Sequence, residues 1–162
     1  MIDYYVLTSF EEENLDNLYV NIQLNTSKPA EYCGDRAMYV NITNNVLALI
    51  DTGASICGIS KRTVESMKLK PYREIDIRTA TGIYKHHTYL FDVIFPNDKM
   101  FENIEAVEIR NPDGFYPSSD FVIGMNILRQ GDMAFTSVNG KMCFSFIRRS
   151  LYGLIPRGLP RL

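Results

Sequence analysis

The sequence lacks the features that mark secreted, membrane-spanning or nucleic-acid-binding proteins. Its first twenty residues hold an acidic run, Glu11 to Glu13, and no basic-then-apolar pattern, so no secretory signal peptide is predicted. No apolar run approaches the ~20 residues that a membrane-spanning helix needs. The formal net charge of −2 provides no basic surface, so we expect neither nucleic acid nor a membrane as a partner.

Cysteine and histidine are also scarce. Cys33, Cys57 and Cys143 include no C-x-x-C pair of the kind found in redox and zinc sites, which favours free thiols in a reducing compartment and a cytoplasmic location. The two histidines, His86 and His87, are consecutive, so in a strand their side chains point to opposite faces. No cluster of metal-ligating residues accompanies them, and we predict neither a metal site nor a cofactor.

The chain does contain enough apolar sequence for one folded domain. Its 162 residues are 46% hydrophobic, a length at which roughly 70% of the unfolded surface is buried on folding. Alternation of apolar and polar residues with period two predicts strands. These expected strands lie at residues 18–24, 38–42, 74–79, 83–95, 101–109, 133–138 and 141–147.

Turn and capping residues divide these strands. Ala80-Thr81-Gly82 predicts a hairpin between 74–79 and 83–95, and Asn139-Gly140 predicts one between the last two strands. Asn44-Asn45 predicts a further hairpin, leading into a buried strand that ends at Asp51. The remaining expectations are a loop at 25–36 and short helices at 61–68, capped by Ser60, and at 125–130.

The most informative stretch is the buried strand together with the turn after it. Five apolar residues, Val46 to Ile50, lead directly into Asp51, although acidic residues are seldom buried without compensation. Gly53 removes a side chain beside the carboxylate, so that backbone amides and a substrate could approach closely. The Thr52 hydroxyl can donate and accept hydrogen bonds at once. Taken alone, the Asp-Thr-Gly tripeptide also fits an ordinary turn aspartate that caps its own loop.

A second apolar motif occurs later in the chain, Phe121-Val122-Ile123-Gly124-Met125-Asn126-Ile127-Leu128. Together with Asp51-Thr52-Gly53-Ala54-Ser55 it resembles the retropepsin-like aspartic proteases, over about residues 38 to 147. That family has Asp-Thr-Gly-Ala/Ser after an apolar strand, then two apolar residues, a glycine and a short helix. The resemblance implies an all-β fold, a closed retropepsin-like β-barrel with one or two short helices and one lobe per chain. The protease domain is expected at 18–148, between an N-terminal extension, 1–17, and a basic C-terminal tail, 149–162.

The resemblance also implies an aspartic endopeptidase with Asp51, Thr52 and Gly53 as catalytic residues. Two carboxylates that share a proton can activate water and protonate the leaving nitrogen. Because the chain contains one Asp-Thr-Gly, we expect a homodimer that brings together Asp51 of both copies at a two-fold axis.

The expected partner is a protein or peptide substrate bound as an extended strand. In the resembled family a glycine-containing hairpin folds over the substrate, and residues 79–83 stand at the matching place, although they are poorer in glycine than retroviral flaps. A plain surface hairpin is the alternative. The residues expected at the substrate are Ala54, Ser55, Thr79, Ala80, Thr81, Gly82, Ile83, Val122 and Ile123.

Other assignments remain open from the sequence. The chain could be a catalytically silent relative used for dimerisation or peptide binding, or an unrelated small β-barrel in which Asp51 is a turn residue. Cys57 could act as a nucleophile with His86 or His87, although a small buried hydrophobic residue fits its apolar neighbours better. Asp120 is a further carboxylate near the second motif, but the family pattern places no catalytic acid there.

Overall fold

The computed structural model of the chain describes residues 6–10, 18–29, 39–79, 82–96, 100–109, 119–138 and 141–147. The expected tail at 149–162 and residues 80 and 81 of the expected flap lie outside the described residues. Within them, strands predominate and two short helices interrupt them. The elements are β1 Val6–Phe10, β2 Tyr19–Pro29, β3 Tyr39–Ile50, β4 Cys57–Ser60, α1 Lys61–Ser66, β5 Arg73–Thr79, β6 Gly82–Ile94, β7 Met100–Ile109, β8 Phe121–Ile123, α2 Met125–Leu128, β9 Asp132–Val138 and β10 Lys141–Ile147.

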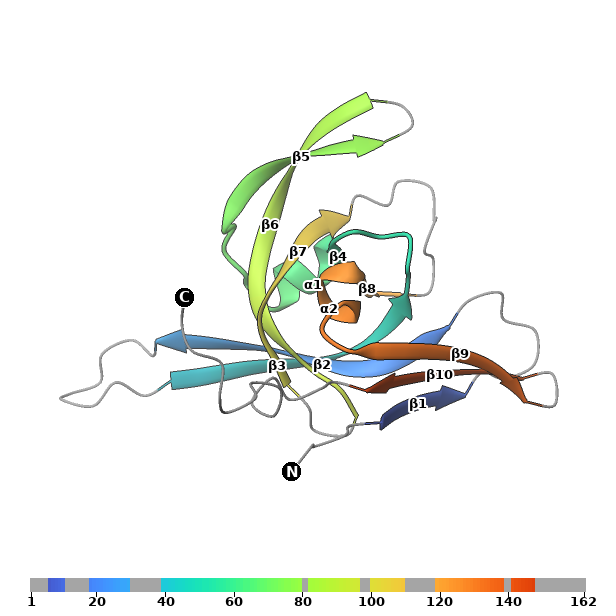
Figure 1. Ribbon diagram of the computed structural model, residues 1–162. Helices are drawn as coiled ribbons and strands as arrows, with labels where there is room; N and C mark the ends of the chain where they lie inside the picture. The colour runs from blue at the N-terminus through green and yellow to red at the C-terminus, as the bar shows by residue number, and fades with distance from the viewer. Residues whose placement is uncertain are drawn as a thin grey trace, which may run out of the picture.

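Six strands form a closed barrel in the order β2-β3-β8-β4-β7-β6 (Figure 1). The barrel is closed by the pairing of β2 with β6, which runs from Gln23 opposite Ile94 to Asn25 opposite Asp92. Strand β8 lies between β3 and β4, parallel to the first and antiparallel to the second. The predicted all-β, single-lobe barrel with short helices is therefore confirmed.

The alternating residues of β2, together with Leu18 just before it, show how the sequence builds the barrel wall. Leu18, Val20, Ile22 and Leu24 are buried, whereas Asn21 and Gln23 between them are exposed. Because successive side chains of a strand point to opposite faces, this pattern places one apolar face inside the barrel. Apolar side chains from all six strands meet there, and the rings of Phe91 and Phe121 pack edge to face at 5.8 Å.

A separate three-stranded sheet, in the order β1-β10-β9, packs against the barrel. Phe146 of β10 lies with its ring centroid 6.3 Å from that of Phe95 and 5.9 Å from that of Phe101. Strand β1 falls within the expected N-terminal extension and pairs with β10 from Val6–Ile147 to Phe10–Cys143. The domain boundaries at residues 17 and 148 stay a prediction.

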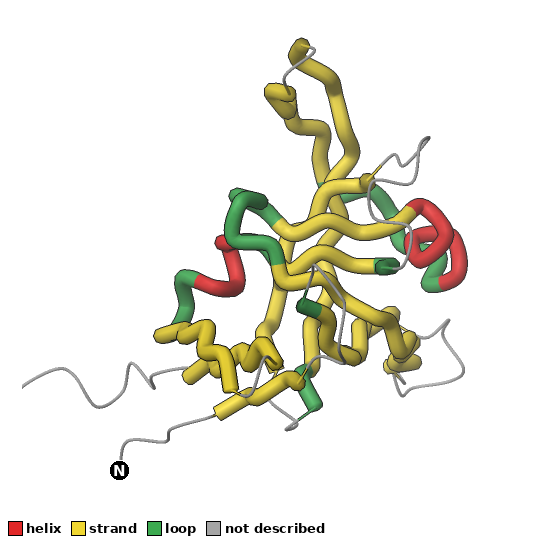
Figure 2. The backbone as a smooth tube through the Cα atoms, turned by 90° about the vertical axis from the view of Figure 1, so that its right-hand side faces the viewer, coloured by secondary structure: helices red, strands yellow, loops and turns green. Residues whose placement is uncertain are grey.

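The β5–β6 hairpin projects from the barrel, as Figures 1 and 2 show from two directions. Its strands pair from Arg73–Thr88 at the root to Thr79–Gly82 near the tip, which confirms the predicted hairpin. Ile75 and Ile77 on one face are half-buried, whereas the charged side chains that alternate with them are exposed. The hairpin therefore has an apolar and a charged face.

Two local predictions were wrong. Asn44 and Asn45 form no turn, since β3 runs unbroken from Tyr39 to Ile50 and pairs with β2 over its whole length. An Asn-Asn pair lacks the glycine that favours a tight hairpin turn, and both residues instead stand opposite β2, Asn44 facing Leu24 and Asn45 facing Gln23. The expected loop at 25–36 begins later, because β2 continues to Pro29.

Both predicted helices are present and begin where expected, but α1 ends at Ser66 and α2 at Leu128, each two residues earlier than predicted. The Ser60 side chain accepts a hydrogen bond from the backbone N–H of Thr63 at 3.2 Å and so caps α1, as expected. α2 begins at Met125, directly after Gly124. Neither helix of the described ranges has the length or apolar character needed to cross a lipid bilayer.

We predict that Phe101→Ala will lower the free energy of unfolding by about 3–5 kcal/mol, because the ring is 1% exposed and fills the contact between the barrel and the small sheet. Denaturant unfolding measures the change. The matched control is Met100→Ala, one position earlier on β7, where the side chain is 40% exposed and the expected loss is about 1 kcal/mol or less. Equal losses for the two variants would contradict this account of the core.

Candidate active site

Asp51 is the first residue after β3, at the end of a strand held on both sides. The Ile50 N–H donates to Leu18 O at 2.9 Å, and the Asp51 N–H donates to Ile123 O at 3.1 Å. Leu49 and Ile50 are buried, whereas Asp51 is half-buried. The buried strand β3 therefore places the Asp51 carboxylate at its end, as the apolar run before Asp51 predicts.

The residues after Asp51 form a tight turn around its carboxylate. Oδ1 of Asp51 accepts from the Gly53 N–H at 2.8 Å, and the Ala54 N–H donates to Asp51 O at 3.3 Å. A Cβ at Gly53 would lie 3.1 Å from Oδ1, a tight contact that glycine avoids. Thr52, Gly53 and Ser55 are exposed in the single chain, and Ala54 is half-buried. One side of the turn is therefore accessible to another molecule.

The structure brings the two sequence motifs into direct contact. Besides the Asp51–Ile123 hydrogen bond, the Met125 N–H donates to Ala54 O at 2.7 Å. At the end of the loop, Oδ1 of Asn126 accepts from the Cys57 N–H at 2.9 Å. The segment β8–α2 therefore holds the 51–57 loop at its beginning, middle and end.

Gly124 permits this contact because no side chain would fit there. A Cβ at position 124 would lie 2.6 Å from both the carbonyl carbon and the oxygen of Ile56, and 2.9 Å from Cys57 N. These are backbone atoms, which cannot move aside without displacing the loop. The glycine that comes after the two apolar residues is thus required by the close approach of β8–α2 to the loop.

The residues expected at the substrate lie in two places. Val122 and Ile123 belong to β8 and are buried among barrel residues, and their role as substrate contacts stays a prediction. Ile83 is 60% exposed on the projecting hairpin, next to Gly82, the first residue of β6. Ala80 and Thr81 lie outside the described residues, as does the side chain of Thr79.

The Asp120 carboxylate is bound by the side chain of Arg62. Both oxygens of its carboxylate accept from Nη2 of Arg62, at 2.6 and 2.7 Å, and Oδ1 also accepts from the Ser60 hydroxyl at 3.2 Å. The backbone of Asp120 bonds to Leu47 O and the Ser60 N–H. These contacts tie α1 to the start of β8 and assign Asp120 a structural role.

The Cys57 thiol has the environment of a buried hydrophobic residue. The side chain is fully buried, and its Sγ accepts from the Gly124 N–H at 3.3 Å. Burial raises the pKa of Cys57 to about 12, against a smaller lowering by hydrogen bonds from Gly124, Ile127 and Asn126. Nδ1 of His86 lies 3.1 Å from Glu108 O. The expectation of a small buried hydrophobic residue is confirmed, and the nucleophile alternative finds no support.

Sequence reasoning missed two features, one in the site and one at the root of the β5–β6 hairpin. Asn126 belongs to the quoted motif, but its role as hydrogen-bond acceptor for the loop was not foreseen. Arg73 and Glu105 form a bidentate ion pair with both nitrogen–oxygen distances at 2.6 Å. No local pattern signals this pair, because the two residues come from different strands.

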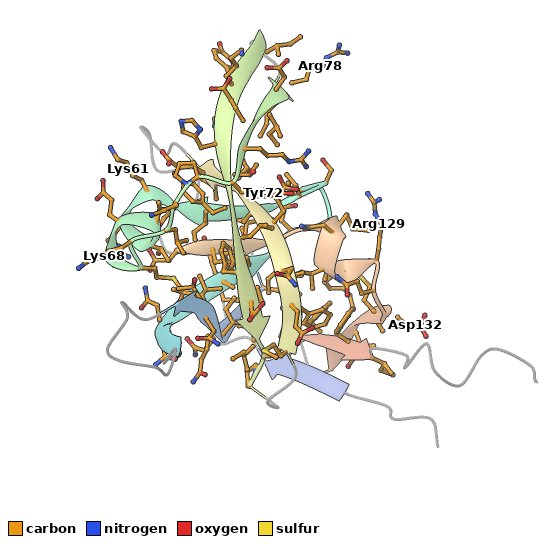
Figure 3. The ribbon with its side chains drawn as sticks, turned by 90° about the vertical axis from the view of Figure 1, so that its left-hand side faces the viewer. Lys61, Lys68, Tyr72, Arg78, Arg129 and Asp132 are labelled. Atoms are coloured by element: carbon orange, nitrogen blue, oxygen red, sulfur yellow. The ribbon has the colours of Figure 1, made fainter. Side chains whose placement is uncertain are left out.

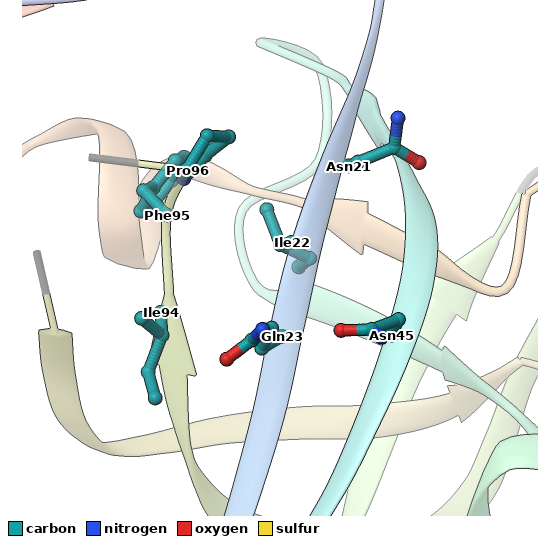
Figure 4. Close-up of a pocket in the computed structure, with 7 residues that line it drawn as sticks. All are labelled: Asn21, Ile22, Gln23, Asn45, Ile94, Phe95 and Pro96. Atoms are coloured by element: carbon teal, nitrogen blue, oxygen red, sulfur yellow. The ribbon is translucent and has the colours of Figure 1, made fainter. Parts of the chain in front are cut away.

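A pocket of about 400 Å³ lies elsewhere on the barrel (Figure 4). It reaches Asn45 of β3, which at ~3.3 Å per residue lies roughly 20 Å along the strand from Asp51. It is therefore separate from the candidate site. The pocket is lined by Asn21, Ile22, Gln23, Asn45, Ile94, Phe95 and Pro96.

Across the ranges described, no group of three or more Cys, His, Asp or Glu residues could hold a metal ion.

Comparison with known proteins shows the family of the chain and proteins of similar fold. The sequence model of the family described as gag-polyprotein putative aspartyl protease matches residues 37–130. A retropepsin-like aspartic protease from Rickettsia conorii has a similar structure, with 18% identity, coverage of 90% of this chain and 96% of that chain, and a TM-score of 0.53. The retroviral protease-like domain of Ddi1 from Leishmania major is matched at 14% identity over 88% and 100% of the two chains, with a TM-score of 0.44. A search of curated proteins gave no match.

We predict that native Cys57 will resist alkylation between pH 7 and 9. Raising the thiol pKa from 9.0 to about 12 reduces the thiolate fraction by about 500- to 1,000-fold in this range, and burial blocks the reagent as well. Iodoacetamide labelling followed by peptide mass spectrometry measures the effect at Cys57 itself. The same protein unfolded in guanidinium is the control and should label within minutes. Equal labelling rates in the two states would contradict the buried, protonated thiol.

Proposed function

Because the chain belongs to the gag-polyprotein putative aspartyl protease family, we propose that it is an aspartic endopeptidase. In this proposal it hydrolyses peptide bonds through a water held between two Asp51 carboxylates, one from each chain of a homodimer. The observation that carries the proposal is the position of Asp51 at the end of β3, bonded through its backbone to Ile123. A half-buried carboxylate on a turn with one accessible side suits a reaction that a second copy completes.

The chemistry requires a second carboxylate. Two like charges a few ångströms apart cannot both ionise, so one carboxylate retains a proton and serves as acid while the other activates water. Asp120 is paired with Arg62 and is unsuited to this role. A two-fold axis through the site supplies Asp51 of the second copy, so that one Asp51 serves as acid and the other activates water. The interface then uses the same surface of both copies.

The neighbouring residues take supporting roles in this proposal. The Thr52 hydroxyl, which is exposed in the single chain, braces the two loops against each other across the axis. Gly53 allows the water and the peptide to approach the carboxylate closely. Ala54 and Ser55 pack or hydrogen-bond beside the carboxylate, and Ala54 O is already held by the Met125 N–H at 2.7 Å.

The proposed substrate is a protein or peptide chain in extended form, bound as an added strand by main-chain hydrogen bonds. The β5–β6 hairpin covers it in this arrangement, with residues 79–83 closest to the peptide. The projection of the hairpin from the barrel and the exposure of Ile83 support this placement. Val122 and Ile123, both buried in the single chain, are proposed as apolar walls of the substrate subsites.

We predict that Asp51→Asn will reduce peptide cleavage by at least about 10³-fold, because the amide can neither accept nor deliver the proton. Cut sites in a diverse peptide pool, mapped by mass spectrometry for wild type and variant, measure the effect. Asp120→Asn is the matched control: it removes the other carboxylate near the second motif, and cleavage should remain measurable. Cleavage by Asp51→Asn at the wild-type rate would overturn the assignment, and an inactive wild type would favour a catalytically silent relative.

We further predict that activity per chain will fall on dilution towards the dimer dissociation constant, because a single chain holds half of the catalytic pair. Initial rates over a range of enzyme concentrations, with sedimentation velocity at the same concentrations, test this. Constant activity per chain in a proven monomer would contradict it.

Mixing experiments separate a shared site from a dimer of independent sites. In an equal mixture of wild type and Asp51→Asn that exchanges freely, about a quarter of the dimers contain two wild-type chains. A shared site therefore retains about a quarter of the activity of pure wild type at the same total chain concentration. Independent sites would retain about half.

A further inference from the structure

The loop that carries Asp51 is connected by hydrogen bonds to the root of the β5–β6 hairpin. The connection begins at Asn126, whose carboxamide bridges two strands. Its Oδ1 accepts from the Cys57 N–H at 2.9 Å, and its Nδ2 donates to Glu105 O at 2.8 Å. One side chain on α2 therefore fixes the end of the 51–57 loop relative to β7.

Glu105 continues the connection towards the hairpin. Its carboxylate accepts from Nε and Nη2 of Arg73, each at 2.6 Å. This two-point, charge-assisted geometry restricts orientation as well as distance. The Glu105 side chain is 19% exposed and that of Arg73 is 56% exposed, and the Arg73 guanidinium lowers the pKa of Glu105 against the opposing effect of burial.

Arg73 is the first residue of β5 and pairs with Thr88 of β6 at the root of the hairpin. Its carbonyl oxygen accepts from the buried Thr88 hydroxyl at 3.3 Å, and the preceding Tyr72 N–H donates to Thr88 O at 2.7 Å. The guanidinium also lies over the Tyr72 ring, 5.9 Å from its centroid. Figure 3 shows Tyr72 at the root of the hairpin and Arg78 near its tip.

We propose that Asn126, Glu105 and Arg73 act as positioning residues that couple the orientation of the hairpin to the geometry of the 51–57 loop. The inference rests on the proposed function, in which the hairpin covers the substrate and the loop carries the catalytic carboxylate. A displacement of the hairpin root is then transmitted to Cys57 through two strands and one carboxamide. Substrate binding beneath the hairpin and placement of Asp51 are linked by the same bonds.

Two substitutions interrupt the connection at different points. Arg73→Ala removes the fork that holds Glu105. Asn126→Asp keeps an oxygen that can accept from the Cys57 N–H but replaces the donor to Glu105 O with a second acceptor, which breaks one link while preserving the side-chain shape. Residual activity of Asn126→Asp should rise relative to wild type as pH falls and the introduced carboxyl gains a proton, because a protonated carboxyl can donate again.

A double-mutant cycle on a peptide cleaved by wild type tests the coupling. Each single variant is expected to lower kcat/KM about three- to tenfold, through a fall in kcat as well as a rise in KM. The double variant should retain at least the kcat/KM of the less active single variant, because both changes break the same connection. Lys85→Ala is the matched control: it removes the ion pair with Glu74, which joins the two hairpin strands to each other, and kcat/KM should stay within about twofold.

Hydrogen exchange provides a readout that does not need catalysis. Arg73→Ala should accelerate amide exchange in residues 54–57, although the Arg73 side chain belongs to the hairpin root, whereas Lys85→Ala should not. Multiplicative losses in the cycle, or unchanged exchange of the loop in Arg73→Ala, would overturn the coupling. If wild type cleaves nothing, the proposed function fails while exchange still tests the coupling. If Asp51→Asn is inactive and the cycle is multiplicative, the coupling fails alone.

Discussion

The candidate site depends on the hydrogen bonds that join the 51–57 loop to β8 and α2. Because β8 lies between β3 and β4 and pairs with both, the loop that connects β3 to β4 must pass around β8. One bond holds the loop at each of three points, through Asp51 N, Ala54 O and Cys57 N. Backbone groups and one carboxamide make these bonds, so the position of the carboxylate is set by the course of the chain. The Asp51 carboxylate adds a bond within the turn, from the Gly53 N–H to Oδ1.

Burial beneath the loop and exposure above it divide the site into two layers. Ile123, Gly124 and Cys57 are buried, and no side chain larger than hydrogen fits at Gly124. Thr52 and Gly53 are exposed above them. A rigid buried layer keeps reacting groups in place, as functional sites require, and an open upper layer lets a second copy and a peptide approach. This division agrees with a site that one chain supplies in part.

The family resemblance predicted the barrel and period-two patterns predicted many of its strands, but the contact between the two motifs was not predicted, and local patterns failed where distant strands decide the outcome. Period-two alternation located β2, and the apolar run before Asp51 located the end of β3. The Asn44-Asn45 turn was wrong because long pairing with β2 outweighs a weak local turn preference. The contacts of Asn126 with Cys57 and of Arg62 with Asp120 span 69 and 58 positions. They arise from the strand order of the closed barrel, which periodicity alone does not reveal.

The ion pair at the root of the hairpin separates two kinds of structure within one sheet. On the barrel side of this ion pair, β6 belongs to the closed barrel and its apolar side chains are buried on the inner face. On the other side, towards the tip, the hairpin consists of two strands whose charged face is exposed. Such a two-stranded ribbon has little stability of its own. Its direction is therefore set at the root, where the Arg73 fork binds Glu105 of β7. A peptide bound beneath it would gain contacts from exposed side chains of the hairpin such as Ile83, which is 60% exposed in the single chain. In the proposed function, that gain would offset the cost of holding the hairpin in one orientation over the peptide, while the bonds of the 51–57 loop to β8 and α2 position the carboxylate.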